Sequence, residues 1–335
     1  MKFNHFLSSY YPDVNYGGQR LFNDMVEQAK FADALGYDAV SIPEHHLLNV
    51  LLTPAPLQMA VKVAAVTKRV EIVTSIAVLP LHDMRIFAGE VIQADMLCDG
   101  RLTLGVGRGA FEYEMERLGV AMDDTRECFD ESLAVLEALL TQEEVSWDGK
   151  YYKFDPITVM PRPMRKPQLM IAALAPPAIY HCAKRGMHVQ TTPLEGNNQM
   201  MMDQVAAFHE GKAQSDQPET LKLSLLRVCY TAKSQQDADE KLVLTNDYFK
   251  RFDNVFTGPG KVKNGQIEPL PRTQTIEELS KSVLICPAEE MIDRLSLYKE
   301  AGIDEIILNA NIGASQSEVL DAMQRFAEDV MPHFK

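Results

Sequence analysis

The sequence is short of cysteine, and it has no long apolar run. Its five cysteines lie scattered along 335 residues, are odd in number and form no CxxC pair, which disfavours a disulfide framework. No apolar run approaches the roughly 20 residues that a membrane-spanning helix needs. The first residues, MKFNHFLSSYYPD, lack the apolar core of a signal peptide. We therefore expect a cytoplasmic protein with reduced thiols and no membrane segment.

Positive charge is also scarce. The chain has 33 lysines and arginines against 47 aspartates and glutamates, so its formal net charge is -14. An acidic surface repels nucleic acid and anionic membranes, and we expect neither as a partner. In contrast, 46% of the residues are hydrophobic, which is enough for a large core and excludes a disordered chain. These features suit a protein that handles small molecules.

Strand-like apolar runs alternate with segments of helical periodicity along most of the chain. Parallel strands joined by helices form either an open doubly wound sheet or a closed barrel, and eight such units favour the barrel. We therefore predict an α/β fold with one domain over residues 1–335, a (β/α)8 TIM barrel with insertions. The predicted strands are 2–8, 37–43, 70–80, 101–107, 168–174, 187–192, 221–231 and 304–310. The predicted helices include 21–35, 54–68, 86–98 and 316–329.

Two segments do not fit this alternation. Residues 145–155 contain VSWDGKYYKF, which predicts a hairpin turning at Asp148-Gly149 and inserted into the barrel. Residues 253–282 contain three glycines and three prolines and are too long for an ordinary connection, so we expect a lid-like insertion without regular elements. The pattern Asp-Thr-Arg-Glu from Asp124 to Glu127 predicts a capping box that opens a helix.

Polar side chains follow several predicted strands. Glu44, His45 and His46 follow the second strand, and His82 follows the third. Active sites of such barrels lie at the carboxyl ends of the strands, so these residues are candidates for a site. The adjacent histidines have no HExxH spacing, and we expect no metal. A general acid or base, a cofactor contact and a histidine bonded to the backbone all remain open.

The stretch LGVGRGAFEYE, residues 104–114, ends the fourth predicted strand. Its glycines allow a ligand to approach the backbone closely, and Arg108 can pair with a phosphate. The stretch does not open a helix, so it is not a dinucleotide fingerprint. A phosphate site and a tight turn with a salt-bridged arginine both remain open. Phe111 in this stretch could line a substrate pocket or pack in the core.

Seven motifs occur in the order found in one protein family. They are EHH at 44–46, TSIAVLP at 74–80, DGRLTLGVGRG at 99–109, DDTR at 123–126, AKRG at 183–186, AGIDEIIL at 301–308 and DVMP at 329–332. With these motifs the chain resembles the bacterial luciferase-like, flavin-dependent monooxygenases, among them the alkanal monooxygenase subunit. The resemblance covers almost the whole chain and implies a (β/α)8 barrel, in agreement with the strand count.

The resemblance also implies roles for individual residues. His45 would act in catalysis beside the flavin, with His46 as its neighbour, and Glu114 falls where the luciferase subunit has an active-site aspartate. Ser75-Ile76 falls where the family has a non-prolyl cis peptide bond beneath the flavin ring. The residues implied to bind the cofactor are Ser75, Ile76, Arg108, Gly109, Ala110 and Arg126, the last four at its phosphate.

The chain departs from the family pattern at two places. The family often binds the phosphate with serine and threonine hydroxyls after the fifth strand, where this chain has Ala175 and Ala178. Phosphate binding is then expected to depend more on the arginines. Luciferase has a reactive cysteine where this chain has Gly107, and we expect the glycine to leave room beside the flavin.

The resemblance implies a two-component monooxygenase. A separate flavin reductase would supply reduced FMN, and with O₂ the enzyme would oxidise a small organic substrate such as an aldehyde or ketone. A homodimer through helices 54–68 and 86–98 is expected, as the family pairs. Two alternatives remain: a deazaflavin-dependent oxidoreductase on the same barrel, and a non-catalytic flavin-binding partner subunit.

Overall fold

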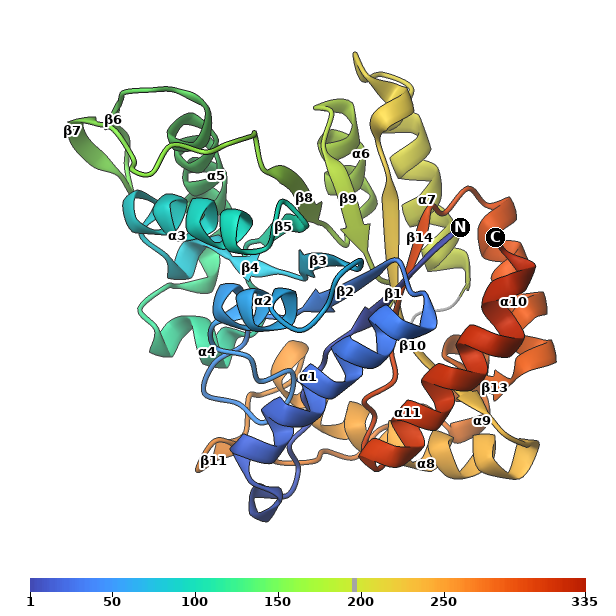
Figure 1. The fold of residues 1–335 in the computed structure, drawn as a ribbon. Coiled ribbons are helices and arrows are strands. Elements are labelled where there is room, and N and C mark those ends of the chain that lie inside the picture. The colour runs from blue at the N-terminus through green and yellow to red at the C-terminus, as the bar shows by residue number, and fades with distance from the viewer. Residues whose placement is uncertain (195–197) are drawn as a thin grey trace.

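Parallel strands close into a barrel at the centre of the molecule (Figure 1). The structure, a computed structural model, describes residues 1–194 and 198–335. The barrel strands in this part of the chain are β1 (Lys2–Phe6), β2 (Ala39–Ile42), β3 (Glu71–Thr74), β5 (Leu102–Gly107), β8 (Gln168–Ala172), β9 (His188–Thr191), β10 (Leu223–Ala232) and β14 (Glu305–Asn309). β10 pairs with both β9 and β14, and β14 pairs with β1, which closes the ring. The predicted TIM barrel is therefore confirmed.

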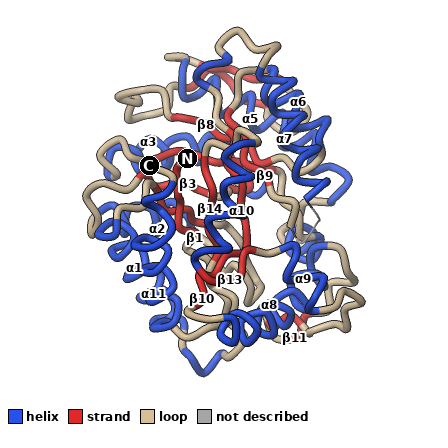
Figure 2. Tube along the Cα trace, turned by 90° about the vertical axis from the view of Figure 1, so that its right-hand side faces the viewer, coloured by secondary structure: helices blue, strands red, loops and turns tan. Residues whose placement is uncertain are grey.

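Helices surround these strands, as the turned view in Figure 2 shows. The longer helices are α1 (Gly18–Leu35), α2 (Pro56–Ala64), α3 (Met84–Leu97), α5 (Thr125–Thr141), α6 (Pro176–Lys184), α7 (Asn198–Lys212), α8 (Gln235–Phe256), α10 (Ala288–Glu300) and α11 (Gln316–Arg325). Two short helices, α4 (Glu112–Arg117) and α9 (Ile276–Ser282), lie in connections. None of the helices in the described residues is both long and apolar enough to span a membrane.

The two faces of the barrel strands differ in polarity, because successive side chains of a strand point to opposite sides. Phe3 and Val40 face outward and are fully buried in the apolar core between strands and helices. On the inner face, Asn4 Nδ2 and Ser224 Oγ donate hydrogen bonds to the buried Glu305 carboxylate at 3.3 and 2.7 Å. The main apolar core therefore lies outside the barrel, and polar groups fill part of its interior.

The third predicted strand is interrupted. β3 ends at Thr74, the peptide bond between Ser75 and Ile76 is cis, and the chain resumes as the two-residue strand β4 (Ala77–Val78). β4 pairs with Val106 and Gly107 at the carboxyl end of β5. The cis bond implied by the family resemblance is thus present, and it lies at the carboxyl end of a barrel strand.

The predicted capping box at Asp124 is wrong. A 3₁₀ turn (Met122–Asp124) runs directly into α5, so Asp124 already has helical backbone angles and its side chain makes no capping hydrogen bond. An N-cap residue needs an extended backbone, which this turn does not allow. The last predicted helix also changes character, because α11 ends at Arg325 and continues as a π-helical turn (Phe326–Val330).

The predicted hairpin insertion forms. β6 (Val145–Asp148) and β7 (Lys153–Ile157) pair antiparallel and lie beside α5 (Figure 1). Glu131 of α5 fixes the turn, because its carboxylate accepts the backbone N–H groups of Lys150, Tyr151 and Tyr152 at 3.1, 3.0 and 3.0 Å. One carboxylate therefore satisfies three turn donors that have no strand partner.

The segment 253–282 contains regular elements, so the expectation of none is wrong. Its start belongs to α8, and β11 (Val262–Lys263) and β12 (Gln266–Ile267) form a small hairpin before α9. The buried side-chain amide of Asn254 holds the segment together. Its Nδ2 donates to the carbonyls of Lys261 and Glu268, and its Oδ1 accepts the backbone N–H of Lys261. Ile267 N–H donates to Asn49 Oδ1 at 2.9 Å, which ties the segment to the loop after β2.

One parallel strand was not predicted. β13 (Leu284–Pro287) pairs with the second half of β10, beyond the part of β10 that pairs with β14. Its four residues follow α9 directly, and so short a run at the end of a proline-rich segment gave no separate strand signal.

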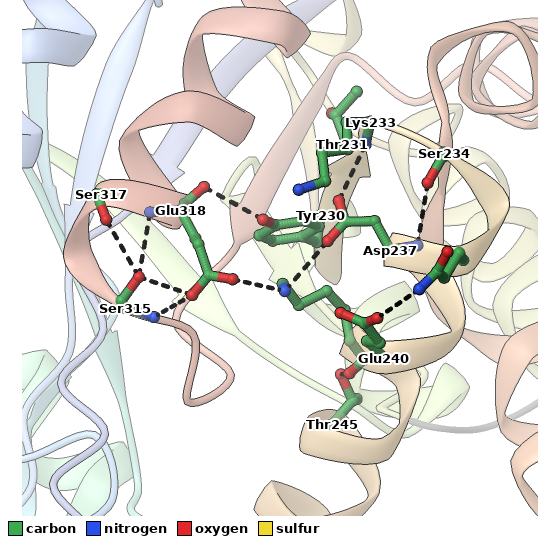
Figure 3. A network of polar contacts seen from close by, with 12 residues as sticks. Tyr230, Thr231, Lys233, Ser234, Asp237, Glu240, Thr245, Ser315, Ser317 and Glu318 are labelled. Atoms are coloured by element: carbon green, nitrogen blue, oxygen red, sulfur yellow. Dashed lines mark hydrogen bonds and ion pairs between the residues drawn. The ribbon is translucent and has the colours of Figure 1, made fainter.

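A buried lysine braces two of the outer helices. Lys241 of α8 forms ion pairs with Asp237 at 3.1 Å and with Glu318 of α11 at 2.8 Å. Figure 3 shows Glu318 beside Ser315, which caps α11, and Tyr230, whose hydroxyl donates to the Glu318 carbonyl at 3.3 Å. We call Lys241, Asp237 and Glu318 the lysine network. The hydrogen bond from Lys241 contributes most to lowering the pKa of Glu318 to about 2.

Candidate active site

The loop after β2 brings three titratable side chains to the mouth of the barrel. Glu44 is completely buried, whereas the side chains of His45 and His46 are 15% and 22% exposed. The loop folds back on itself, since His45 N–H donates to the Thr53 carbonyl at 3.3 Å. This local bridge fixes the direction in which the two adjacent histidines diverge.

His45 is oriented by a buried carboxylate. Its Nδ1 lies 2.9 Å from Oε2 of Glu114, which is 2% exposed on α4, and the other oxygen of Glu114 accepts the backbone N–H of His46. Since the carboxylate accepts at Nδ1, that nitrogen holds the hydrogen, and in the neutral ring Nε2 is the free acceptor. The ring also stacks on Phe111 at 4.2 Å between centroids. The structure thus brings together His45, His46 and Glu114, and it buries Phe111 as a core residue.

A second carboxylate, Glu44, joins two histidines. Its Oε1 accepts from Nε2 of His46 at 2.9 Å and from Nε2 of His82 at 2.8 Å, and its Oε2 accepts the N–H of Val78 at 2.8 Å. Burial alone would raise the pKa of Glu44, but the hydrogen bonds from His46, His82 and Val78 together outweigh it and lower the pKa to about 2. The bond to Glu44 in turn raises the pKa of His46. We call Glu44, His46 and His82 the histidine network.

Sequence reasoning did not predict this network. Both Glu44 and His82 were recognised as strand-end residues, but 38 positions separate them and no motif spacing connects them. The available signal was that both residues follow the carboxyl ends of neighbouring parallel strands, β2 and β3. The carboxyl ends of all strands lie on the same side of such a barrel.

The cis peptide bond and strand β5 lie side by side at the mouth of the barrel. Thr74 Oγ1 donates to the carbonyl of Gly105 at 2.7 Å, and Ser75 Oγ donates to Gln190 Oε1 at 2.9 Å. A Cβ atom at Gly107 would lie 2.3 Å from Cδ1 of Ile76. The expectation that Gly107 leaves room is therefore wrong, because the Ile76 side chain fills that space.

Two predicted arginines are exposed and have free guanidinium groups. Arg108 follows β5 and Arg126 lies in the first turn of α5, and within 1–194 and 198–335 neither makes a hydrogen bond or an ion pair. Gly109 bends the chain after Arg108 with a φ of +84°, and a Cβ there would lie 2.6 Å from Met115 Sδ. The tight turn is present, but the salt bridge that this alternative required is not found among the described residues.

The profile of the family described as luciferase-like monooxygenase matches residues 1–328. Curated proteins that are similar over most of their length include a flavin-dependent and an F420-dependent enzyme. The oxygenase component of the flavin-dependent trigonelline monooxygenase of Acinetobacter baylyi is 28% identical, over 94% of this chain and 91% of that protein. The F420-dependent glucose-6-phosphate dehydrogenase of Beutenbergia cavernae is 27% identical, over 93% of each chain.

Solved structures show the same fold. The monooxygenase RslO1 from Streptomyces bottropensis superposes with a TM-score of 0.84 at 23% identity, covering 100% of both chains. The oxygenating constituent of 3,6-diketocamphane monooxygenase from Pseudomonas putida, solved in complex with FMN, gives a TM-score of 0.80 at 16% identity, covering 100% of this chain and 99% of that one.

Proposed function

The chain belongs to the luciferase-like monooxygenase family, and we propose that it is the oxygenase component of a two-component, FMN-dependent monooxygenase. A separate flavin reductase supplies reduced FMN, and O₂ and the enzyme oxidise a small organic substrate such as an aldehyde or ketone. The observation that carries this proposal is the His45–Glu114 hydrogen bond, which holds an imidazole with a free Nε2 at the barrel mouth. The similarity to the A. baylyi oxygenase component supports the two-component organisation.

The residues at the mouth fit a flavin mononucleotide. The hydroxyls of Ser8, Ser41 and Thr191 are buried near strand ends and have no hydrogen-bond partner in the described part of the chain, so they can serve the polar edge of a ring system. Arg108 and Arg126 have free guanidinium groups for a phosphate. Gly109 and Ala110 offer backbone beside Arg108, and Ser75-Ile76 offers a surface for the ring.

The protein's part in the reaction is to position, to shield and to move protons. When bound, reduced FMN supplies the electrons that activate O₂. Glu114 keeps the ring of His45 in one orientation, so that Nε2 takes or gives a proton at a fixed place.

The cofactor assignment is tested by binding. We expect Arg108→Ala and Arg126→Ala each to weaken FMN binding by about 1.5–3 kcal/mol, the usual contribution of a charge-assisted contact. Riboflavin, which has no phosphate, should bind equally well to wild type and both variants. Arg20→Ala is the matched control, since Arg20 is an exposed arginine that stacks on Tyr16 of the neighbouring turn. Unchanged FMN affinity in both test variants would reject the phosphate assignment.

A deazaflavin-dependent oxidoreductase is the second candidate. The observation that favours it is the similarity to the F420-dependent dehydrogenase, whose identity to this chain is only one percentage point lower than that of the trigonelline enzyme. Competition between FMN and F420 in one titration separates the two candidates. Membership in a family of monooxygenases supports an enzyme over a non-catalytic partner subunit.

We propose that the segment 253–282 covers the site. Its hairpin bonds the loop after β2 through Ile267 and Asn49, and Gly260 lies beside Tyr113 of α4. A cover would exclude water from the bound reduced flavin. We expect slower hydrogen exchange in this segment with FMN than without it, and equal exchange rates would argue against a lid.

A homodimer through α2 and α3 is also part of the proposal. Ile86 and Leu97 of α3 are 65% and 53% exposed, so this helix has apolar surface available for a second copy. Light scattering at micromolar concentration should give twice the mass of the 37.6 kDa chain. A monomer under these conditions would refute the pairing.

A further inference from the structure

His82 approaches the candidate site from outside the loop that holds the paired histidines. It directly follows a 3₁₀ turn (Leu79–Leu81) that leads to α3, and its ring stacks on Phe87 at 4.4 Å. Tyr152 of the hairpin insertion fixes its backbone, because the Tyr152 hydroxyl donates to the His82 carbonyl at 3.0 Å. Three separate elements therefore determine where this imidazole lies.

His82 and His46 share one oxygen atom. Their Nε2 atoms lie 2.8 and 2.9 Å from the same Oε1 of Glu44. The second oxygen, Oε2, accepts the N–H of Val78 and lies 3.1 Å from Nε2 of His82. A single buried carboxylate has one negative charge, so it stabilises one imidazolium well and two poorly, because the two cations repel each other. Protonation of either ring therefore disfavours protonation of the other, which is the condition for coupled titration.

The two rings have different surroundings. His46 lies beside Glu44 and Glu114, next to His45. His82 lines a cavity of about 620 Å³ between the 3₁₀ turn, the start of α5 and the hairpin. The charged and titratable groups of this outer cavity, besides His82, are Asp83, Arg85, Asp124, Cys128, Tyr151, Tyr152 and Lys153. Asp83 and Arg85 neutralise each other in an ion pair.

We propose that His82, which lines the outer cavity, is a positioning residue that controls, through Glu44, the protonation of His46. One net proton is distributed over the two rings. A change in the outer cavity that stabilises the cationic form of His82 then lowers the protonation of His46. The coupling is a property of the protein without cofactor, and only its catalytic consequence rests on the proposed function.

The test is a histidine titration of the FMN-free protein by long-range ¹H–¹⁵N NMR. In wild type we expect the ring nitrogens of both His46 and His82 to report two shared titration steps. His82→Gln keeps a donor for Glu44 but removes the second titrating ring, so the His46 curve should become a single step at higher pH. His82→Ala removes the donor as well and should give the same single step. His181→Gln, at an exposed histidine of α6, should leave the His46 curve unchanged.

Two results would overturn the coupling. One is a single-step His46 curve in wild type, and the other is a His46 curve that is the same in wild type and in His82→Gln. Glu44→Gln provides an independent check, because loss of the carboxylate should lower the pKa of His46. If the coupling is found but FMN neither binds nor supports turnover, the proposed function fails and the coupling stands. If substrate oxidation occurs and its pH profile does not move in His82→Gln, the catalytic consequence is refuted.

Discussion

Among the described residues, the histidine network and the lysine network each place one buried central group between two partners, but their charges are arranged in opposite ways. In the histidine network a fully buried carboxylate, Glu44, meets two imidazoles. In the lysine network the ammonium of Lys241, 4% exposed, meets Asp237 and Glu318. Hydrogen bonds to these two carboxylates outweigh burial and raise the pKa of Lys241. The lysine network therefore holds a constant charge at neutral pH, whereas the histidine network can change its charge there.

The positions of the two networks match this difference. The lysine network joins the amino-terminal parts of α8 and α11 (Figure 3), where a constant ion pair braces two helices. The histidine network lies at the carboxyl ends of β2 and β3, where barrel active sites occur. Buried charge alone therefore does not identify a functional site; the partner must also titrate near the working pH.

The largest expected effect comes from the loss of His45, which lies next to the histidine network. His45→Ala should lower substrate oxidation about 10²–10⁴-fold, the usual contribution of a general acid or base. The variant should still fold and bind FMN, because His45 lies on a loop and only its ring is lost. Reduced flavin still meets O₂, so hydrogen peroxide should replace oxidised substrate, and a coupled peroxide assay measures it.

His46→Ala is the matched variant for that experiment. The backbone N–H of His46 still reaches Glu114, so the orientation of His45 is kept and the loss should be smaller. If His46→Ala uncouples O₂ use from product formation while His45→Ala does not, the catalytic role belongs to the other histidine. If neither does, both histidines are structural.

The lysine network should affect stability and leave the chemistry unchanged. Lys241→Met leaves the buried Asp237 without its cation, and loss of one partner of a buried pair costs about 3–5 kcal/mol in the free energy of unfolding. Urea denaturation measures the change. The control is Lys281→Met, which breaks an exposed pair with Glu277 and should change stability by no more than about 0.5 kcal/mol. A reduced turnover per folded molecule in Lys241→Met would contradict the assignment of this network as a brace.

The smallest effect is a difference in pH dependence between the networks. The folded pKa of His46 is raised, so its stabilising contribution is complete below its unfolded pKa near 6.5 and is lost as pH rises through the folded value. The stability difference between wild type and Glu44→Gln should therefore fall from pH 6 to pH 8. The difference for Glu318→Gln should stay constant over that range, because the pKa of Glu318 is about 2 and Lys241 remains protonated.

Glu318→Gln can also be compared with wild type in acid. The folded pKa of Glu318 is below its unfolded value, so its contribution is present above about pH 4.5 and is lost as pH falls toward 2. The Glu318 side chain is 44% exposed, and solvent screening limits this contribution to about 1 kcal/mol or less. Stability curves of wild type and Glu318→Gln that stay parallel between pH 5 and pH 3 would contradict the linkage.

Much of the fold could be predicted because short apolar runs alternate with segments of helical periodicity along the chain. The eight barrel strands bury their outward side chains under helices, and that pattern is visible in the sequence. The four-residue strand β13 and helix α9 were missed because they follow a proline-rich segment and depend on tertiary partners such as β10. The Asp124 capping box failed because a preceding 3₁₀ turn, which the sequence pattern does not reveal, keeps the backbone helical.

The site was predicted in part. His45, His46 and Glu114, to which the resemblance assigns catalytic roles, lie in contact, and Ser75-Ile76 is cis. The link from Glu44 to His82 is a contact between two loops, and nothing in local spacing encodes such a contact. The space at Gly107 was misjudged for the same reason, since the atom that fills it belongs to Ile76 on the neighbouring strand end.

The most direct test of the proposed function is the fate of the oxygen atoms. The protein is mixed with FMN, a flavin reductase, NADH as the electron donor and ¹⁸O₂, and aldehydes and cyclic ketones are screened as substrates by mass spectrometry. The account predicts a product that contains one ¹⁸O atom per turnover, formed with FMN and lost in His45→Ala. Turnover that requires F420 in place of FMN, and that leaves the product unlabelled, would contradict it.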